Sequence, residues 1–413
     1  MEKTNNFVQQ RVFNDPIHGF ISIPGDLIFG LIQHPYFQRL RRISQLGLTN
    51  IVYSGALHTR FQHAIGAMHL MQQAIDILRA KGHAISQEEA LGVNVAILLH
   101  DIGHGPYSHT LEHSLVKGVS HEDVSSLIMN KLNAEFNGAL DLAISIFRNQ
   151  YHKKYLHQLV ASQLDMDRLD YLERDSFFCG VKEGVVNSQR IIKMLNIIDG
   201  ELVVDAKGIY SVEKFLIARR LMYWQVYLHK TVISAEYLLI MVLKRARYLI
   251  REGQQLFATP SLQYFLKNDI TRADFLKNAD PLANFTELDD FDIMASIKAW
   301  CKHTDVVLAT LCKRIVNRHL LKIKLRATPF SEAEIAEEKQ KAMQMLGLNA
   351  AEVEYFVFTD DITNSAYKPD NDKIRVLYKD GSTADVAVAA DLLNISTLSV
   401  EVKKYFMCYP QTA

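Results

Sequence analysis

The sequence predicts a mainly α-helical protein with a small α+β unit at its C-terminal end. Over most of the first 345 residues, apolar side chains recur at three- to four-residue spacing, which is the pattern of helices with a buried face. Beyond residue 346 this pattern gives way to short strand-like runs separated by turn-forming residues. We therefore expect a helical core with a helical extension over residues 1–345 and a small α+β domain over residues 346–413.

The helical signals can be followed along the chain. Apolar spacing predicts a helix over 61–80, and Ser86-Gln-Glu-Glu89 is a capping box that opens a second helix running to Asp101. Gly103 and Gly105-Pro106 end this second helix. Further helices are expected from near Ser108, over 121–136, 140–147, 156–178, 188–198 and 211–251, and between a capping box at 331–334 and a C-cap at Gly347.

Strand-like segments fall in two places. Glu201-Leu-Val-Val-Asp205 is followed by Ala-Lys-Gly and then by Ile209-Tyr210, which predicts a small hairpin. In the C-terminal unit, Lys-Asp-Gly-Ser at 379–382 has the composition of a tight turn. Strands are expected there over 353–358, 373–378, 384–389 and 402–408.

Charge, cysteine content and hydropathy limit the class of protein. Lysine plus arginine and aspartate plus glutamate number 46 each, so the sequence lacks the positive field of a dedicated nucleic-acid or anionic-membrane binder. The four cysteines form no C-x-x-C pair, which indicates reduced thiols. The N-terminal residues lack the apolar stretch of a signal peptide, and the most apolar run, 237–243, is far shorter than the ~20 residues that cross a bilayer. We therefore expect a soluble cytoplasmic protein.

Histidine is the residue type that points to chemistry. Nine of the 16 histidines lie between His58 and His121, and neutral imidazole is the commonest metal ligand in proteins. The apolar stretch 95–99 delivers His100 and Asp101 side by side at the end of a predicted helix. A carboxylate beside an apolar run is costly to bury without a partner. A divalent cation held by His100 and Asp101 would neutralise it.

A second group of polar residues lies on the predicted helix that contains residues 165–175. Asp167, Tyr171, Arg174 and Asp175 share one face of this helix because they are spaced at i, i+4, i+7 and i+8. A face made of two acids, a phenol and a guanidinium is either a solvated surface or the wall of a site. Taken alone, the pattern is more typical of a surface.

Together, His63, His100-Asp101 and Asp167 resemble the H…HD…D signature of the HD-domain phosphohydrolases. The resemblance covers about residues 11–230 and is strongest to the deoxynucleoside triphosphate triphosphohydrolase branch. It implies an HD-type helical core and hydrolysis of a dNTP to deoxynucleoside and inorganic triphosphate. The motifs that carry it are Val12-Phe-Asn-Asp-Pro-Ile-His-Gly19, Phe37-Gln-Arg-Leu-Arg41, Gln45-Leu-Gly47, Arg60-Phe-Gln-His63, His100-Asp-Ile-Gly-His-Gly-Pro-Tyr-Ser-His109, Asp167-Arg-Leu-Asp-Tyr171 and an echo at Val402-Lys-Lys-Tyr-Phe406.

The resemblance also implies roles for single residues. A divalent metal ion, for which manganese, iron, magnesium, zinc and nickel are all compatible, would be held by His63, His100, Asp101 and Asp167. A catalytic cluster over the phosphates would consist of His104, His109, Glu112 and His121. The nucleotide substrate would be held by Gln45, Arg60, Arg168, Tyr171, Asp175 and Arg219. Two positions depart from the mammalian member of the family, which has aspartate at position 112 and lysine at position 168.

Three alternatives stay open. His109-Thr-Leu-Glu-His113 matches H-x-x-E-H, the inverted zinc-peptidase motif, but this leaves the four proposed metal ligands unexplained. Another HD activity, a nucleoside monophosphate phosphatase or a cyclic-nucleotide phosphodiesterase, would use the same ligands. The third alternative is a non-catalytic nucleotide-sensing or nucleic-acid-binding module, against which the intact ligand set and the zero net charge argue.

The resemblance further implies assembly. In the mammalian family member a guanine nucleotide binds between subunits, and Arg11, Asn14, Gln38 and Arg41 match contributors to that site. The position whose carboxylate contacts the guanine edge aligns with Gln33, whose amide would set one N–H donor against another. We therefore expect a homo-oligomer, most simply a two-fold dimer, without a guanine-specific activator site. A plain dimer interface is the alternative role of these segments.

Overall fold

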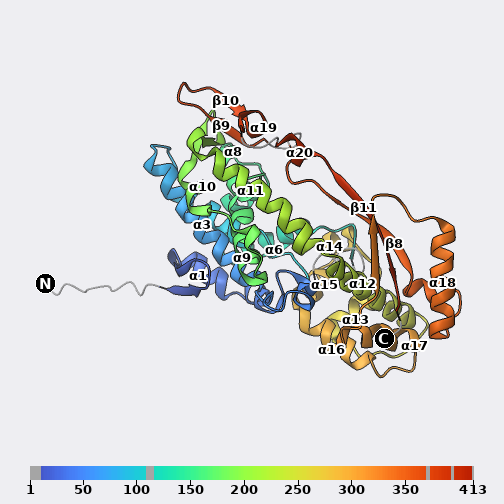
Figure 1. Cartoon of the computed structure of the whole chain (residues 1–413). Helices are drawn as coiled ribbons and strands as arrows, with labels where there is room; N and C mark the ends of the chain where they lie inside the picture. The colour runs from blue at the N-terminus through green and yellow to red at the C-terminus, as the bar shows by residue number, and fades with distance from the viewer. Residues whose placement is uncertain (1–10, 108–115, 369–372, 392–394, 412–413) are drawn as a thin grey trace.

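The computed structural model describes residues 11–107, 116–368, 373–391 and 395–411, and it is mainly α-helical (Figure 1). Its centre is α3 (Arg60–Ala80), which packs against both α4 (Gln87–Leu99) and α9 (Met166–Cys179). The prediction of a helical core with a small α+β unit towards the C-terminus is confirmed.

The described residues form further helices besides these three. In chain order they are α1 (Gly25–Gln33), α2 (Pro35–Gln38), α6 (His121–Glu135), α7 (Asp141–Phe147), α8 (Lys154–Val160), α10 (Ser188–Met194), α11 (Ile209–Met222), α12 (Lys230–Arg251), α13 (Pro260–Lys267), α14 (Arg272–Lys277), α15 (Asp280–Glu287), α16 (Asp290–Trp300), α17 (Val306–Val316), α18 (Glu332–Leu346), α19 (Val386–Ala389) and α20 (Ser396–Ser399).

The central helices begin where the sequence supplies capping groups. Thr59 and Gln62 form a capping box before α3, and Ser86 and Glu89 form one before α4. Asp165 caps α9 through its side chain. Helices α3 and α4 therefore start within one residue of the positions that the sequence predicts.

The single helix expected over 156–178 is wrong, because the chain forms α8 and α9 instead. The Asp165 carboxylate accepts hydrogen bonds from the backbone amides of Ser162 and Arg168, both at 2.7 Å. A side chain that satisfies backbone donors in this way favours a helix start over a helix interior. The break places Asp167 in the first turn of α9, next to α3.

The small hairpin is also displaced from its expected place. β5 (Glu201–Asp205) pairs antiparallel with β4 (Leu195–Ile198), whereas the sequence analysis expected it to pair with the residues after Ala-Lys-Gly. β4 occupies the end of the segment that was expected to be a helix over 188–198. Asp199 and Gly200 form the turn with φ values of 53° and 79°, a conformation that ends the preceding helical pattern. Ile209 instead begins α11.

The long helix predicted from Ser211 is divided in two. A π-helical turn, Tyr223–Tyr227, follows α11, and the His229 side chain caps α12. Within the described residues, no single helix is long and apolar enough to cross a membrane. The stretch Ala206–Tyr227 and α12 pass this test only as a pair, and the pair is bent by 55°.

The C-terminal strands pair with strands that come earlier in the chain. β11 (Val402–Tyr409) lies between β7 (Lys322–Arg326) and β8 (Phe358–Asn364), antiparallel to both. β9 (Arg375–Leu377) pairs in parallel with β5 and antiparallel with β10 (Thr383–Asp385). In Figure 1 the red tail accordingly extends from near α8 to near α18. The division into two domains at residue 345 stays a prediction.

Two of the strands expected in this unit differ in extent. The segment over 353–358 begins as a short 3-10 helix, Val353–Tyr355, and β8 starts only at Phe358. The segment over 384–389 leaves its strand at Asp385, whose side chain caps α19. Two-stranded pairs elsewhere join β1 (Val12–Asp15) to β2 (Gly19–Ser22) and β3 (Val116–Lys117) to β6 (Ile270–Thr271).

Helix α6 packs directly on the turn that follows α4. The Gly103 amide donates a hydrogen bond to Ser125 Oγ at 2.9 Å, and this hydroxyl donates to the His100 carbonyl at 2.8 Å. A Cβ on Gly103 would lie 2.2 Å from the His121 carbonyl oxygen and 2.3 Å from the Ser125 nitrogen. Because Gly103 has no side chain, α6 can pack directly against the end of α4.

Gly103→Ala should therefore destabilise the protein. The added methyl group meets backbone atoms of α6, which cannot rotate away, so we expect a loss of about 1–3 kcal/mol in the free energy of unfolding. Urea denaturation followed by circular dichroism would measure this loss. Gly105→Ala is the matched control, because its methyl group would meet only side-chain atoms, those of the Phe285 ring, at 3.2 Å. Equal stability of the two variants would contradict the close packing of α6.

Candidate active site

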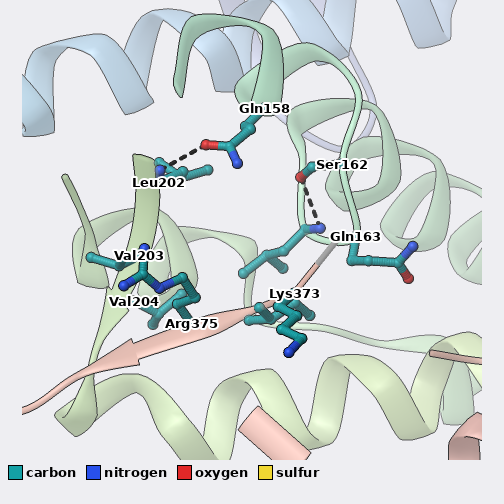
Figure 2. A pocket seen from close by; sticks show the side chains of 10 residues that line it. Gln158, Ser162, Gln163, Leu202, Val203, Val204, Lys373 and Arg375 are labelled. Atoms are coloured by element: carbon teal, nitrogen blue, oxygen red, sulfur yellow. Dashed lines mark hydrogen bonds between the residues drawn. The ribbon is translucent and has the colours of Figure 1, made fainter. Parts of the chain in front are cut away.

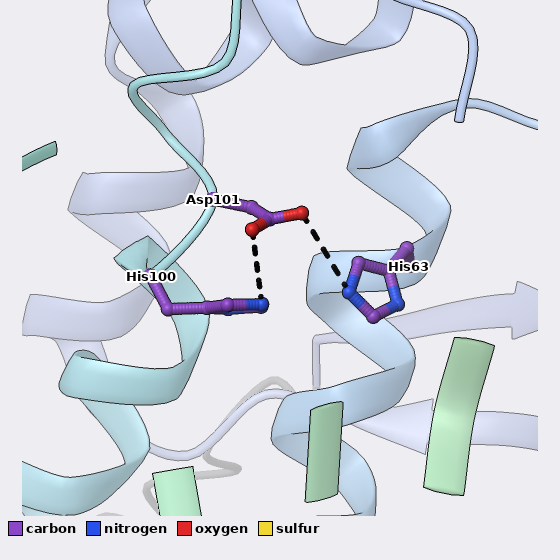
Figure 3. Close-up of side chains that lie close together, drawn as sticks. All are labelled: His63, His100 and Asp101. Atoms are coloured by element: carbon purple, nitrogen blue, oxygen red, sulfur yellow. Dashed lines mark ion pairs between the residues drawn. The ribbon is translucent and has the colours of Figure 1, made fainter. Parts of the chain in front are cut away.

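Four side chains from three central helices meet beside α3. His63 comes from the first turn of α3, His100 and Asp101 follow the last residue of α4, and Asp167 lies in the first turn of α9. Figure 3 shows His63 on its helix facing Asp101, with the His100 ring beneath the same carboxylate. The helix packing around α3 thus gathers residues that are far apart in the sequence.

The polar atoms of these side chains approach one another closely. His63 Nε2 lies 3.1 Å from Asp167 Oδ1 and 3.8 Å from Asp101 Oδ2. His100 Nε2 lies 3.3 Å from Asp101 Oδ1 and 3.4 Å from Asp167 Oδ1. The structure therefore brings together all four residues that the sequence analysis assigned to a metal ion.

The cluster is shaped to hold positive charge. Burial lowers the pKa of His63, but the Asp167 and Asp170 carboxylates more than reverse this effect and raise it to about 10. Burial would raise the pKa of Asp167, yet the imidazoles of His100 and His63 hold it below its usual value. The same carboxylates would stabilise a cation placed between the imidazoles.

The donor set fits a divalent cation. Ligand atoms of His63, His100 and Asp101 all lie within 4.8 Å of one another. Both Nδ1 atoms are already engaged, that of His63 with Asp170 Oδ2 at 2.8 Å and that of His100 with the Ile97 carbonyl at 2.6 Å. Among the described residues, neither buried Nε2 atom has a hydrogen-bond partner of good geometry. Engagement of Nδ1 leaves the Nε2 lone pair free for a metal ion.

Asp101 also contacts a second group of polar side chains. Arg60 Nη1 donates to Asp101 Oδ2, and His104 Nε2 lies 3.3 Å from Asp101 Oδ1. The His121 ring stacks on His104 with 3.9 Å between centroids. Burial, together with the charge of Arg60, lowers the pKa of His104 to about 3, so this imidazole is neutral at physiological pH. His104 and His121 therefore lie beside the four-residue cluster.

The candidates for phosphate and sugar binding extend along α9 and α11. The Arg168 guanidinium pairs with Asp165, and Arg219 Nη1 donates to Gln163 Oε1 at 3.2 Å. The Tyr171 ring lies 6.5 Å from the His63 ring. The Tyr171 ring thus lies beside the cluster, while Arg168 is held by Asp165 and Arg219 by Gln163.

Asp175 and Gln45 are linked through a residue that the sequence analysis left unassigned. His58 Nε2 lies 2.7 Å from Asp175 Oδ1. The backbone carbonyl of His58 accepts a hydrogen bond from the backbone N–H of Gln45 at 3.0 Å. Tyr227 donates to the other Asp175 oxygen at 2.8 Å. The density of histidines around residue 58 was the available signal for His58.

Two predicted catalytic residues, His109 and Glu112, lie outside the described residues. The H-x-x-E-H motif over 109–113 lies outside them as well. The described part of the chain therefore does not test these assignments.

The interpretation of the polar face of α9 as a solvated surface is wrong. Arg174 is completely buried and Asp175 is 1% exposed. Asp170, to which the sequence analysis assigned no role, is also completely buried and touches His63. These charges are buried because they bind one another and groups on other segments, which helical spacing alone does not reveal.

Arg39 was also missed as a residue that holds the site together. Its buried guanidinium donates to the carbonyls of Leu288 at 2.8 Å, Ile102 at 3.3 Å and His104 at 2.7 Å. It therefore ties the turn after α4 to the end of α15. Its place in the Phe37–Arg41 motif was the only sequence signal.

A small hollow beside Gln163 is too small to be the substrate site. It lies between α8, β5 and the segment that leads into β9, with Gln158, Lys373 and Arg375 among the residues that line it (Figure 2). Its volume of about 20 Å³ admits little more than a water molecule. It marks the seam between the helical core and the C-terminal strands.

Comparisons with known proteins agree with this geometry. The family model described as the HD domain matches residues 60–175, and the model described as the HD associated region matches residues 186–258. The uncharacterised protein YwfO of Bacillus subtilis is 31% identical over 383 residues, which are 89% of this chain and 84% of YwfO. The crystal structure of a phosphohydrolase from Bacteroides thetaiotaomicron, at 52% identity, matches with a TM-score of 0.95 and covers 98% of this chain and 100% of its own.

A further relative is the SAMHD1 homologue of Dictyostelium discoideum, which is named a deoxynucleoside triphosphate triphosphohydrolase. It is 31% identical over 265 residues, which are 60% of this chain and 51% of that protein. The matched HD domain contains all four clustered side chains, from His63 to Asp167. The chain belongs to the HD-domain phosphohydrolase family, on the branch that includes the SAMHD1 proteins.

Proposed function

We propose that the protein is a metal-dependent hydrolase that converts a dNTP to a deoxynucleoside and inorganic triphosphate. The observation that carries this proposal is the convergence of His63, His100, Asp101 and Asp167, with Arg60 bound to the same Asp101 carboxylate. The cluster thus combines cation ligands with an arginine suited to a polyanion. The named activity of the SAMHD1 relatives supports the choice of substrate.

His63, His100, Asp101 and Asp167 would hold the divalent ion, which manganese, iron, magnesium, zinc or nickel would satisfy. Such an ion lowers the pKa of a bound water and polarises phosphoryl oxygens. The partly exposed side chain of Asp167, at 24%, marks the side of the cluster open to a ligand.

The remaining residues would bind the nucleotide and transfer a proton. Arg60, Arg168 and Arg219 carry guanidiniums that form charge-assisted, often bidentate hydrogen bonds to phosphate oxygens. An imidazole, His121 or His109, would protonate the departing 5′-oxygen, while His104 stacks on His121 and orients it. Glu112 would supply the carboxyl group of this catalytic cluster. Gln45, Tyr171 and Asp175 would contact the sugar and the base.

We also propose that the protein forms a homo-oligomer through its N-terminal segments. Phe20 is 76% exposed on the β1–β2 hairpin, which suits a surface covered by a second copy. Gln38 donates to the Ile32 carbonyl at 2.7 Å and accepts from Arg41 at 3.0 Å. These bonds within one chain leave the two side chains less available to a guanine nucleotide, which supports a dimer interface without a guanine-specific site.

Metal content should follow the four proposed ligands. His63→Ala and Asp167→Ala should each abolish stoichiometric metal in the purified protein, measured by inductively coupled plasma mass spectrometry, because each deletes a ligand. His121→Ala should retain the metal but reduce turnover by about 10²–10⁴-fold, because it removes a proton donor. Full metal occupancy in Asp167→Ala would contradict the assignment.

Product analysis would test the reaction itself. We expect incubation with each dNTP and Mn²⁺ or Mg²⁺ to release deoxynucleoside and triphosphate, separated by chromatography. The Asp167→Ala protein, purified in parallel, controls for contaminating phosphatases. Release of dNMP and pyrophosphate would refute this reaction.

Addition of GTP would test the regulatory proposal. We expect GTP to change dNTP hydrolysis no more than ATP does, because the Gln33 amide mispairs with the guanine edge, at a cost of roughly 5- to 150-fold in affinity. Gln33→Asp should gain a GTP response if the pocket otherwise binds nucleotide. Strong guanine-selective activation of the wild-type protein would contradict the proposal.

A further inference from the structure

We propose that Asp170 is a positioning residue for His63 and that it is held in place by the N-terminal turn Asp15–His18. The inference rests on the proposed metal site and extends it to a segment outside the matched HD domain. It follows from one continuous buried network that joins three segments of the chain.

The network is centred on the Asp170 carboxylate. Oδ2 accepts a hydrogen bond from His63 Nδ1 at 2.8 Å and another from Arg174 Nε at 2.9 Å. Oδ1 accepts from His18 Nε2 at 2.7 Å and from Arg174 Nη2 at 2.9 Å. Four donors thus converge on two oxygens, so the carboxylate has one well-defined orientation.

Asp15 closes the network through the backbone of the turn. Its Oδ2 accepts from Arg174 Nη1 at 2.8 Å. Its Oδ1 accepts from the backbone amides of Ile17 at 2.9 Å and His18 at 3.0 Å. The residue that fixes the turn therefore also fixes the guanidinium that holds Asp170.

The charges in this network favour a cation at His63. Apart from the two imidazoles, the network contains two carboxylates and one guanidinium, which leave one negative charge. Asp15, Asp170 and Arg174 are at most 8% exposed, so this charge is poorly screened by water. A carboxylate bonded to Nδ1 makes an imidazole a stronger metal ligand through Nε2 and fixes its orientation. His63 Nε2 is the atom that faces Asp101 and Asp167.

The space for Asp170 depends on a glycine of α3. A Cβ on Gly66 would lie 2.1 Å from Asp170 Oδ1 and 2.2 Å from Arg174 Nη2. Helices α3 and α9 therefore pack closely enough for this buried ion pair only because position 66 has no side chain. The network is fitted into the interface between the two helices that carry His63 and Asp167.

A positioning role predicts an effect on metal binding in the folded protein. Removal of a group that orients a metal ligand typically reduces metal affinity about 10–100-fold. We expect a loss of this size for Asp170→Asn, because the amide nitrogen would replace an oxygen that accepts hydrogen bonds from two of the four donors. His18→Leu, which removes one of the four donors, should cause a smaller loss of affinity.

The experiment measures Zn²⁺ affinity by competition with a chromophoric chelator. The four proteins compared with wild type are Asp170→Asn, His18→Leu, His18→Gln and His69→Gln. His18→Gln supplies an N–H donor at the same place, so it should restore the affinity that His18→Leu loses. His69→Gln is the matched control, because the His69 ring lies 5.5 Å from the His18 ring but bonds to Gln73.

A second readout, nuclear magnetic resonance, begins with the wild-type protein. In Zn²⁺-loaded wild-type protein labelled with 15N-histidine, we expect the His63 Nδ1 proton to resonate far downfield, as a donor to a buried carboxylate does. In Asp170→Asn this resonance should move upfield. Thermal denaturation of each metal-free protein identifies any variant that has lost its fold.

The outcomes separate the two proposals. If wild-type protein binds none of the five compatible metal ions, the proposed function fails and this inference fails with it. If wild-type protein binds Zn²⁺ and folded His18→Leu binds it equally well, only the inference is overturned. An NMR signature of Zn²⁺ bound to His63 through Nδ1 would also overturn the inference alone, even if Asp170→Asn does not fold.

Discussion

The central helices bury three carboxylates around one imidazole, and the contacts of these charges determine how the helices can pack. Asp101, Asp167 and Asp170 surround His63, and charges in such a setting are stable only if each is paired and hydrogen-bonded. Arg174 pairs with Asp170 and Arg60 with Asp101. Asp167, which lacks an arginine partner among the described contacts, remains directed at the histidines. The negative charge without an arginine partner is therefore concentrated where the proposed metal ion would bind.

The elements that local chemistry determines could be predicted from the sequence. The helix over 61–80 and the capping box at Ser86 follow from apolar spacing and from side-chain bonds three residues away. The break at Asp165 could not be predicted in the same way, because an acidic residue fits both a helix face and a helix N-cap. The partner of β5 could not be predicted either, since its parallel neighbour β9 lies in the C-terminal unit. Pairings across such distances have no local signal.

The residues of the site also divide into those that a sequence motif indicates and those that only the packing of distant segments brings into contact. The side chains that meet at the cluster, His63, His100, Asp101 and Asp167, belong to a recognisable spaced signature, so the sequence alone could indicate them. The residues that hold them, such as His18 and Asp170, form contacts that span 152 positions. Both residues fall within motifs that carry the family resemblance, but nothing in either segment indicates that they contact each other. Their role becomes visible only when the packing of α3, α9 and the N-terminal turn is known.

Helix geometry explains how α9 provides both a proposed metal ligand, Asp167, and the carboxylate that orients His63, Asp170. Asp167 and Asp170 are three residues apart, so they lie on neighbouring parts of one face, separated by a rise of about 4.5 Å along the axis. The His63 ring fits between them, with Nε2 directed at Asp167 and Nδ1 at Asp170. A shift of α9 by one residue would bring the apolar Leu169 to the position of Asp170. The register of α9 on α3, which Gly66 and Arg174 fix by close packing, therefore determines which carboxylate faces the open site and which one orients the imidazole.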